Sequence, residues 1–263
     1  MAEVNFEIFE GDQNSSVILH VPHSSRVIPE DIRAEILLND ANLEAELDEI
    51  TDSRTDFLAE RAAIGARIKP SIFMNRLSRL VIDPERFPDD REVMNEIGMG
   101  AVYLKTSTGR DLRRVNKTRD QLMIDRFFTP YSQALEDLVR SRLRVNGFVT
   151  IVDVHSYRMI EHPNGVNKGQ RRPPVCLGVD DFHTPDWLCE LATESFSQVG
   201  EVVINEPYSG TYVPLSLYES ENRVSSVMME NREDVLSPQE IEGTIDALTA
   251  LIDGIEAARA REK

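Results

Sequence analysis

Two short apolar runs that lie far apart in the chain each lead into a histidine followed by serine. Val17–Val21 continues through Pro22 to His23, and Phe148–Val154 continues directly to His155. Runs of this length and composition are typical of buried strands, and the carboxyl ends of parallel strands meet at one crevice along a sheet edge. We therefore predict that the two histidines face one shared site, which we interpret as a metal site.

Strand-like segments alternate with helix-like segments along the rest of the chain. Strands are also predicted at 67–73, 77–82, 175–179, 201–205 and 225–230, with an edge strand within 1–16. Helices are predicted at 31–38, 42–66 (as one helix or two), 117–145, 184–199 and 237–260. This alternation predicts an α/β fold, a three-layer sandwich around a mixed, largely parallel central sheet. Residues 84–120 are charged and weakly periodic, so we interpret them as a long excursion from the sheet. The sequence contains no convincing domain linker, so we expect a single domain over 1–263.

The chain is strongly acidic, with 46 Asp and Glu against 29 Lys and Arg and a formal net charge of -17. This charge argues against nucleic acid and anionic membranes as partners. No apolar run has the length of a membrane span, and the first residues do not resemble a signal peptide. Cys176 and Cys189 do not indicate a disulfide scaffold. We predict a cytoplasmic enzyme or binding protein, and the oligomeric state is not readable.

A metal site needs a further ligand, because catalytic zinc typically takes three protein ligands from His, Asp or Glu and leaves a place for water. The acidic segment 47–56 offers Asp52 and Asp56, which are four apart and would share a helix face. Their spacing does not choose between them. Asp153 lies two residues before His155, so in a strand it faces the same side and could orient a ligand or a catalytic group.

Each of these candidates also has a purely structural explanation. A single histidine at a strand end is more often a hydrogen-bonded edge residue than a ligand, and an acidic helix face is usually just solvated. His20 lies within the first strand, where we expect it to be packed or to support a neighbouring ligand.

Three arginines, Arg76, Arg79 and Arg86, surround the predicted strand at 77–82. In so acidic a protein they could hold an anionic substrate, since guanidinium groups match carboxylates in bidentate geometry. One of them could polarise a scissile carbonyl. Structural ion pairs with the acidic residues between 83 and 90 explain these arginines equally well.

Glu230 ends the predicted strand at 225–230. A carboxylate there could take a proton from water and pass it to a leaving amine; a plain strand-terminal glutamate is the alternative. The segment 205–212 carries glycine and tyrosines, so it is a candidate substrate-contact loop or a bare turn.

Six motifs, in order from about residue 17 to 232, resemble the N-formylglutamate amidohydrolase family. They are His-Val-Pro-His-Ser-Ser (20–25), Thr-Asp-Ser-Arg-Thr-Asp (51–56), Ser-Arg-Leu-Val-Ile-Asp-x-x-Arg (78–86), Val-Asp-Val-His-Ser-Tyr (152–157), Asn-Glu-Pro-Tyr-Ser-Gly-Thr-Tyr (205–212) and Met-Met-Glu-Asn-Arg (228–232). The resemblance implies a zinc-carboxypeptidase-like (phosphorylase/hydrolase-like) fold. It implies zinc-dependent hydrolysis of N-formyl-L-glutamate, or a related N-acyl amino acid, to formate and glutamate, within histidine catabolism.

The resemblance also implies a ligand set for the metal. His23, Asp52 and His155 would bind one zinc ion per chain, with Asp56 as the alternative carboxylate. Sites of two histidines and an aspartate accept several divalent metals, so another metal is an alternative to zinc.

The same resemblance implies roles around the metal. Glu230 would be the general base and acid, Arg79 would steady the oxyanion, and Arg86 would grip a carboxylate of a small anionic N-acyl amino acid. Further substrate contacts are expected at Arg76, Ser156, Tyr157, Tyr208 and Gly210.

One position departs from the family pattern. Related enzymes often carry Asp-x-Asn-Arg where this chain has Asp83-Pro84-Glu85-Arg86. Glu85 brings a negative charge beside the proposed carboxylate grip, which would weaken the binding of an anionic substrate unless Glu85 turns away or pairs elsewhere. An amidase for another N-acyl amino acid or a peptide-like cell-wall fragment, and a non-catalytic binding protein on the same fold, are therefore kept as alternatives.

Overall fold

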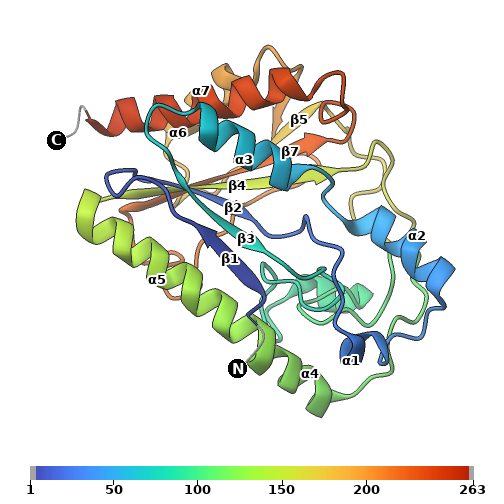
Figure 1. Cartoon of the computed structure of the whole chain (residues 1–263). Coiled ribbons are helices and arrows are strands. Elements are labelled where there is room, and N and C mark those ends of the chain that lie inside the picture. The colour runs from blue at the N-terminus through green and yellow to red at the C-terminus, as the bar shows by residue number, and fades with distance from the viewer. Residues whose placement is uncertain (1–3, 261–263) are drawn as a thin grey trace.

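The computed structural model describes residues 4–260 and is built around one sheet of seven strands in the order β1-β3-β2-β4-β7-β5-β6 (Figure 1). The strands are β1 Phe6–Phe9, β2 Val17–Val21, β3 Ser71–Asn75, β4 Val149–Tyr157, β5 Val175–Gly178, β6 Val202–Ile204 and β7 Val224–Arg232. Four of the six strand pairs are parallel, while β1–β3 and β5–β7 are antiparallel. The predicted mixed, largely parallel sheet is confirmed; the first and last three residues of the predicted domain lie outside the described part.

Helices cover both faces of this sheet. They are α1 Glu30–Arg33, α2 Asp40–Ile50, α3 Thr55–Gly65, α4 Lys117–Met123, α5 Thr129–Asn146, α6 Asp186–Phe196 and α7 Ile241–Ala260, with a 3₁₀ turn η1 Val93–Ile97 and a π turn η2 Ile124–Phe128. Helices α3, α6 and α7 lie along one face and α5 along the other, so the molecule has three layers (Figure 1). Among the described helices, none is long and apolar enough to cross a membrane.

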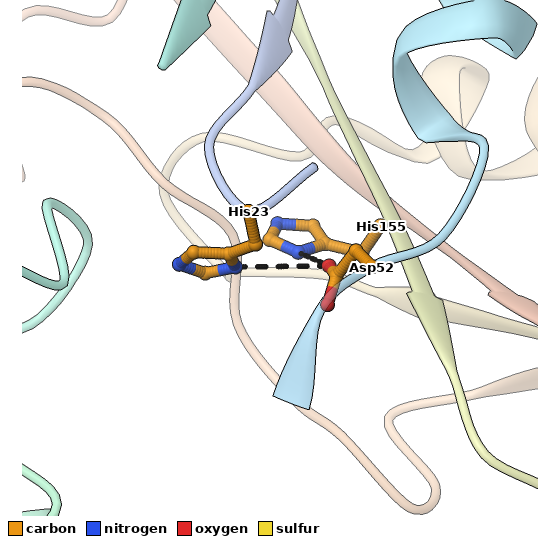
Figure 2. A group of neighbouring side chains, drawn as sticks. All are labelled: His23, Asp52 and His155. Atoms are coloured by element: carbon orange, nitrogen blue, oxygen red, sulfur yellow. Dashed lines mark hydrogen bonds and ion pairs between the residues drawn. The ribbon is translucent and has the colours of Figure 1, made fainter. Parts of the chain in front are cut away.

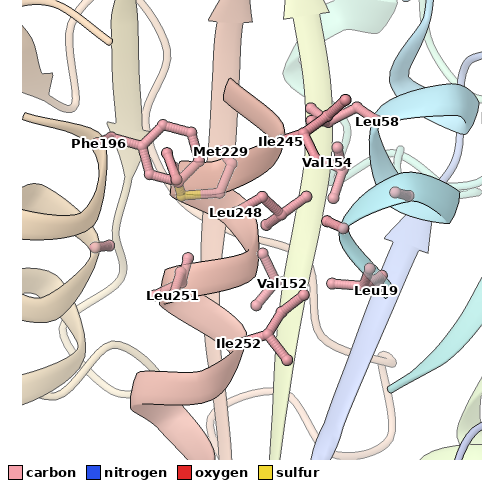
Figure 3. Packing of buried hydrophobic residues seen from close by; sticks show 14 of the residues in the cluster. Leu19, Leu58, Val152, Val154, Phe196, Met229, Ile245, Leu248, Leu251 and Ile252 are labelled. Carbon is pink, nitrogen blue, oxygen red and sulfur yellow. The ribbon is translucent and has the colours of Figure 1, made fainter. Parts of the chain in front are cut away.

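The core on the α7 side shows why the central strands are rigid. Leu248, Leu251 and Ile252 recur at helical spacing on α7, and they pack with Val152 and Val154 of β4 in one buried cluster (Figure 3). Each fully buried aliphatic side chain contributes roughly 1.5–3 kcal/mol to stability. A second cluster closes the α5 face. Every residue of β4 is therefore buried, and its polar side chains need partners inside the protein.

The two longest strands, β4 and β7, extend beyond their predicted ends, so the candidate residues lie within the strands. Strand β4 continues past the predicted end at 154, and β7 continues past 230. His155 and Glu230 are paired directly across these parallel strands. Both side chains are thus held on a continuous backbone ladder instead of on loops.

The prediction of a strand at 77–82 is wrong. This segment is buried but forms turns, with the Ser78 N–H donating to the carbonyl of Val27 and the Val81 N–H to that of Ser78. Its apolar side chains pack with residues of the excursion in two separate clusters, Leu80 in one and Leu77, Val81 and Ile82 in the other. An apolar run alone could not distinguish this buried loop from a strand.

Candidate metal and catalytic centre

The two strand-end histidines converge at one edge of the sheet. His23 follows β2 by two residues and His155 lies near the end of β4, and these two strands are parallel neighbours. The centres of the two imidazole rings are 5.1 Å apart, and both side chains are buried. The structure thus brings together the two residues that the sequence pattern singled out (Figure 2).

Asp52 reaches the histidines from the break between α2 and α3. Arg54 takes a left-handed backbone conformation, with φ of 66°, and this sharp turn separates the two helices. The Asp52 N–H donates to the carbonyl of His23 at 3.1 Å, and the Ser156 N–H donates to Asp52 Oδ2 at 3.3 Å. The break is therefore tied to both strand ends, which fixes the carboxylate between them.

Asp56, the alternative carboxylate, lies elsewhere. It occupies the first turn of α3 and accepts a hydrogen bond from the Phe57 N–H at 2.8 Å. The prediction that Asp52 and Asp56 share a helix face is wrong, because Asp52 precedes the helix. Only Asp52 joins the group with His23 and His155 in the described part of the chain.

The donor atoms of this group face one another. Asp52 Oδ2 lies 2.9 Å from Nδ1 of His155 and 3.6 Å from Nδ1 of His23 (Figure 2). Nδ1 of His23 is buried and has no hydrogen-bond partner among the described residues. Two imidazoles and a carboxylate are a ligand set that zinc takes in hydrolytic sites. An unpartnered buried nitrogen is what a missing metal bond would leave, so these residues fit a divalent metal.

The opposite ring nitrogens face carboxylates. Nε2 of His23 lies 2.9 Å from Asp83 Oδ1, and Nε2 of His155 lies 3.1 Å from Asp153 Oδ2. Glu85 Oε2 lies 3.6 Å and 3.3 Å from the same two nitrogens. Carboxylates in these places favour a proton on Nε2 and leave Nδ1 as the ligand atom. Asp153 thus lies where the sequence predicted a supporting group.

The carboxylate of Asp52 stays ionised in this setting. Burial acts to raise its pKa, but hydrogen bonds with His155 and His23 hold the pKa well below its usual range. The pKa of Asp83 is likewise far below its usual value, because Arg79 and His23 outweigh the effect of burial. Asp52 therefore presents a negatively charged oxygen to a metal. Together with Asp83 it would neutralise much of the charge of a bound cation.

Glu230 projects into the same cavity from β7. Its side chain is buried, and its Oε2 has no hydrogen-bond partner among the described residues. Burial raises the pKa of Glu230 to about 7. A carboxylate with this pKa can both accept and return a proton near neutral pH.

The three candidate arginines have different surroundings. Arg79 donates to Asp83 Oδ2 through Nη2 at 2.8 Å and Nε at 3.2 Å, and it lines the cavity. Arg86 lines the cavity without a hydrogen bond to the described residues. The structure does not bring Arg76 to the site; it is half-exposed and pairs with Glu7 at 3.3 Å.

The cavity has a volume of about 390 Å³ and contains most of the predicted contacts. Ser156, Tyr157 and Tyr208 line it together with the metal candidates. Gly210 does not; it lies at a separate hollow beside Phe182 and takes a positive φ of 82°. Gly210 therefore supplies a left-handed backbone conformation in the loop that follows Tyr208.

Sequence reasoning missed two features of this cavity. Asp83 is the partner of His23, and its position at the end of the apolar run 80–82 could have indicated an inward carboxylate. Arg172 and Glu161 form an ion pair of 2.5 Å in the cavity wall, with Arg172 stacked over Tyr157. Their loop, 158–174, carries no periodic signal from which an inward direction could be read.

Comparisons with known proteins show the family and the fold of the chain. The family model described as N-formylglutamate amidohydrolase matches residues 15–237. The chain is similar in structure to N-formylglutamate amidohydrolase from Ralstonia eutropha JMP134, with a TM-score of 0.81 and 18% identity, over 99% of this chain and 100% of that one. It is also similar to the gene product Atu2144 from Agrobacterium tumefaciens, with a TM-score of 0.74 and 17% identity, over 99% and 97%. These structural similarities show a shared fold. No curated protein sequence matches.

Proposed function

Because this chain belongs to the N-formylglutamate amidohydrolase family, we propose that it is a metal-dependent hydrolase of the amide bond of N-acyl amino acids, with N-formyl-L-glutamate as the reference substrate. One observation carries the proposal: the unpartnered Nδ1 of His23 lies beside Asp52 and His155 in a cavity that also holds Glu230. The predicted cytoplasmic location and the role in histidine catabolism remain predictions.

His23, Asp52 and His155 would hold the metal, for which zinc is our proposal. In sites of this composition zinc acts as a Lewis acid and lowers the pKa of water to about 7. The protein's own contribution is to fix the two imidazoles and the carboxylate before the metal arrives. Asp83 does this through its hydrogen bond with the outer nitrogen of His23, and the Asp153 carboxylate lies 3.1 Å from the outer nitrogen of His155.

Glu230 would move the proton in the reaction. Water adds its oxygen to the acyl carbon, Glu230 accepts the proton that this water loses, and the carbon–nitrogen bond then breaks. The same proton passes from Glu230 to the departing amine, so formate and the free amino acid leave and Glu230 is again ionised. Its pKa of about 7 suits both transfers.

Two arginines would position the substrate. Arg79, held by Asp83 on one side, would direct its remaining N–H groups at the amide carbonyl oxygen, where negative charge develops. Arg86 has no competing hydrogen bond in the described structure and would take a substrate carboxylate. Glu85, which stands where related enzymes often have asparagine, directs its carboxylate at His23 and His155. Arg86 therefore remains available for the substrate.

The experiment that tests this function uses the purified, zinc-loaded protein with N-formyl-L-glutamate. Formate and free amine should appear in equal amounts, and chelation followed by dialysis should abolish the release. Zinc added back should restore it. A zinc-loaded protein that releases neither product from any of a panel of N-acyl amino acids would contradict the proposal and leave the non-catalytic binding protein as the better interpretation.

A further inference from the structure

The cavity wall has little spare positive charge. Four arginines and seven acidic residues line it. Three of the arginines have an acidic partner within 3.1 Å: Arg79 with Asp83 at 2.8 Å, Arg158 with Glu233 at 3.1 Å and Arg172 with Glu161 at 2.5 Å. These guanidinium groups are already committed to carboxylates of the protein.

Arg86 is the exception among the described cavity residues. Its nearest acidic oxygens are those of Asp83 at 3.7 Å and Glu92 at 4.0 Å, and its buried Nε has no hydrogen-bond partner. A guanidinium group binds one carboxylate in bidentate geometry. The cavity is therefore equipped for one substrate carboxylate outside the metal centre.

A second carboxylate would meet an acidic wall. Glu85 lies next to Arg86 in the chain, but its oxygens face His20 at 3.4 Å and His155 at 3.3 Å. The carboxylate still lines the cavity, with its side chain 14% exposed. A carboxylate bound beside it without an unpaired cation would lose hydration and gain repulsion.

The solvent-exposed part of the cavity wall, which we call the mouth, carries three aliphatic side chains. Val93 of η1 is 76% exposed, and Ile160 and Val166 of the loop 158–174 are 80% and 58% exposed, yet all three line the cavity. Exposed aliphatic side chains gathered at one opening are a feature of ligand-binding sites. An apolar group on the substrate would cover them and remove their surface from water.

We propose that this site prefers N-acyl amino acids that carry a single negative charge and an apolar side chain over the dianionic N-formyl-L-glutamate. The inference rests on the proposed amide-hydrolase function and narrows its substrate class. Arg86 takes the α-carboxylate, the amide lies at the metal centre, and the apolar side chain contacts Val93, Ile160 and Val166 at the mouth.

Three substrates of nearly equal size separate charge from polarity. N-Formyl-L-glutamate and N-formyl-L-glutamine differ mainly in the charge of the side chain, and N-formyl-L-leucine replaces the amide by methyl groups. We expect kcat/KM of the zinc-loaded protein to rise from the glutamate to the glutamine to the leucine compound. The total increase should be about tenfold or more, the scale of a single apolar contact.

Variants of the aliphatic residues at the mouth test whether these side chains cause the preference for an apolar substrate. Val93→Ser and Ile160→Ser should lower kcat/KM for the leucine substrate several-fold more than for the glutamine substrate. Val115→Ser is the matched control, because Val115 is 76% exposed, like Val93, but lies outside the cavity. It should change neither value.

The two proposals fail in different ways. If N-formyl-L-glutamate has the highest kcat/KM, or if Val93→Ser and Ile160→Ser affect all substrates equally, this inference is overturned and the amide-hydrolase function stands. If the zinc-loaded protein hydrolyses none of the three compounds, both are overturned.

Discussion

Three groups of histidine and carboxylate among the described residues could hold a metal ion, and two of them, which share no residue, differ in how many of their histidine nitrogens have hydrogen-bond partners. We call them the open triad, His23, Asp52 and His155, and the closed triad, His20, Glu85 and Asp153. In both, the donor atoms lie within 4.8 Å of one another. All three residues of the open triad line the cavity, and two of its buried nitrogens, Nδ1 of His23 and Nε2 of His155, have no hydrogen-bond partner among the described residues. Residue types alone would rate the two groups as equal metal sites.

In the closed triad, both ring nitrogens of the histidine have hydrogen-bond partners. Nδ1 of His20 lies 2.9 Å from Asp153 Oδ1, and Nε2 lies 2.6 Å from the hydroxyl of Tyr131. Burial lowers the pKa of His20, but Asp153 and Glu85 outweigh it and raise the pKa to about 9. Both ring nitrogens of His20 are thus occupied by hydrogen bonds, and neither is free to bind a metal. The comparison teaches that partner satisfaction, more than composition, distinguishes a ligand from a supporting residue.

Breaking the open triad should have the largest effect. In our account His23→Ala or Asp52→Asn removes a metal ligand, so bound zinc should be lost and kcat/KM should fall about a thousandfold or more, since a metal supplies several kcal/mol of transition-state stabilisation. Elemental analysis and formate release measure the two effects. Asp56→Asn, four residues along, is the matched control and should leave both unchanged. Full activity in Asp52→Asn would remove it from the site.

Glu230 sharpens the comparison because it belongs to neither triad. Glu230→Gln keeps the shape of the side chain but cannot accept a proton, so kcat should fall by about 10²–10⁴-fold. Zinc content should stay at the wild-type value, which separates proton transfer from metal binding. Unchanged turnover would show that another group moves the proton.

Asp153 belongs to the closed triad and also lies against His155 of the open triad, so its substitution should give an intermediate effect. Asp153→Asn removes the negative charge beside Nε2 of His155, and zinc affinity should fall about 10–100-fold, as for other outer partners of metal-bound histidines. Competition with a chromogenic chelator gives the affinity directly. Wild-type affinity in this variant would mean that Glu85 alone supports the ring.

The pH dependence of turnover follows from Glu230. Burial raises its pKa to about 7, so Glu230 is protonated below this pH and cannot accept a proton from water. Wild-type kcat/KM should therefore rise up to about pH 7 and fall about tenfold per pH unit below it. Glu230→Gln should lose this limb of the profile. A rate that is constant from pH 5 to 8 in the wild type would contradict the assignment.

The smallest effect is expected inside the closed triad. Tyr131→Phe removes the hydroxyl partner of His20 Nε2 and leaves a buried nitrogen unsatisfied, which should lower the free energy of unfolding by about 1–3 kcal/mol. Urea denaturation measures this change. Zinc affinity should be nearly unaffected, and a loss as large as that in Asp153→Asn would erase the distinction between the triads.

The sequence predicts the convergence of His23 and His155 because each histidine follows an apolar strand, and parallel strands end at one edge. It cannot select Asp52 over Asp56. That choice depends on the left-handed turn at Arg54 and on the hydrogen bond from the Asp52 N–H to the carbonyl of His23. Both are tertiary features without a periodic signal.

The excursion at 84–120, between β3 and α4, and the segment before it show where prediction from the sequence fails. The preceding run 77–82 has the composition of a strand but forms a buried loop whose side chains pack in two clusters, so periodicity gave the wrong element. The loop carrying Glu161 and Arg172 had only composition to indicate its course. Side chains on such segments are directed by long-range contacts, so their place in the cavity could not be read from local pattern.

The central claim is that the open triad, and not its closed neighbour, binds the metal. Zinc content per chain, measured by elemental analysis after dialysis, tests it most directly in the wild type, His23→Ala and His20→Gln. The account predicts one zinc per chain in the wild type and in His20→Gln, and almost none in His23→Ala. Zinc that persists in His23→Ala, or that disappears equally in His20→Gln, would contradict it.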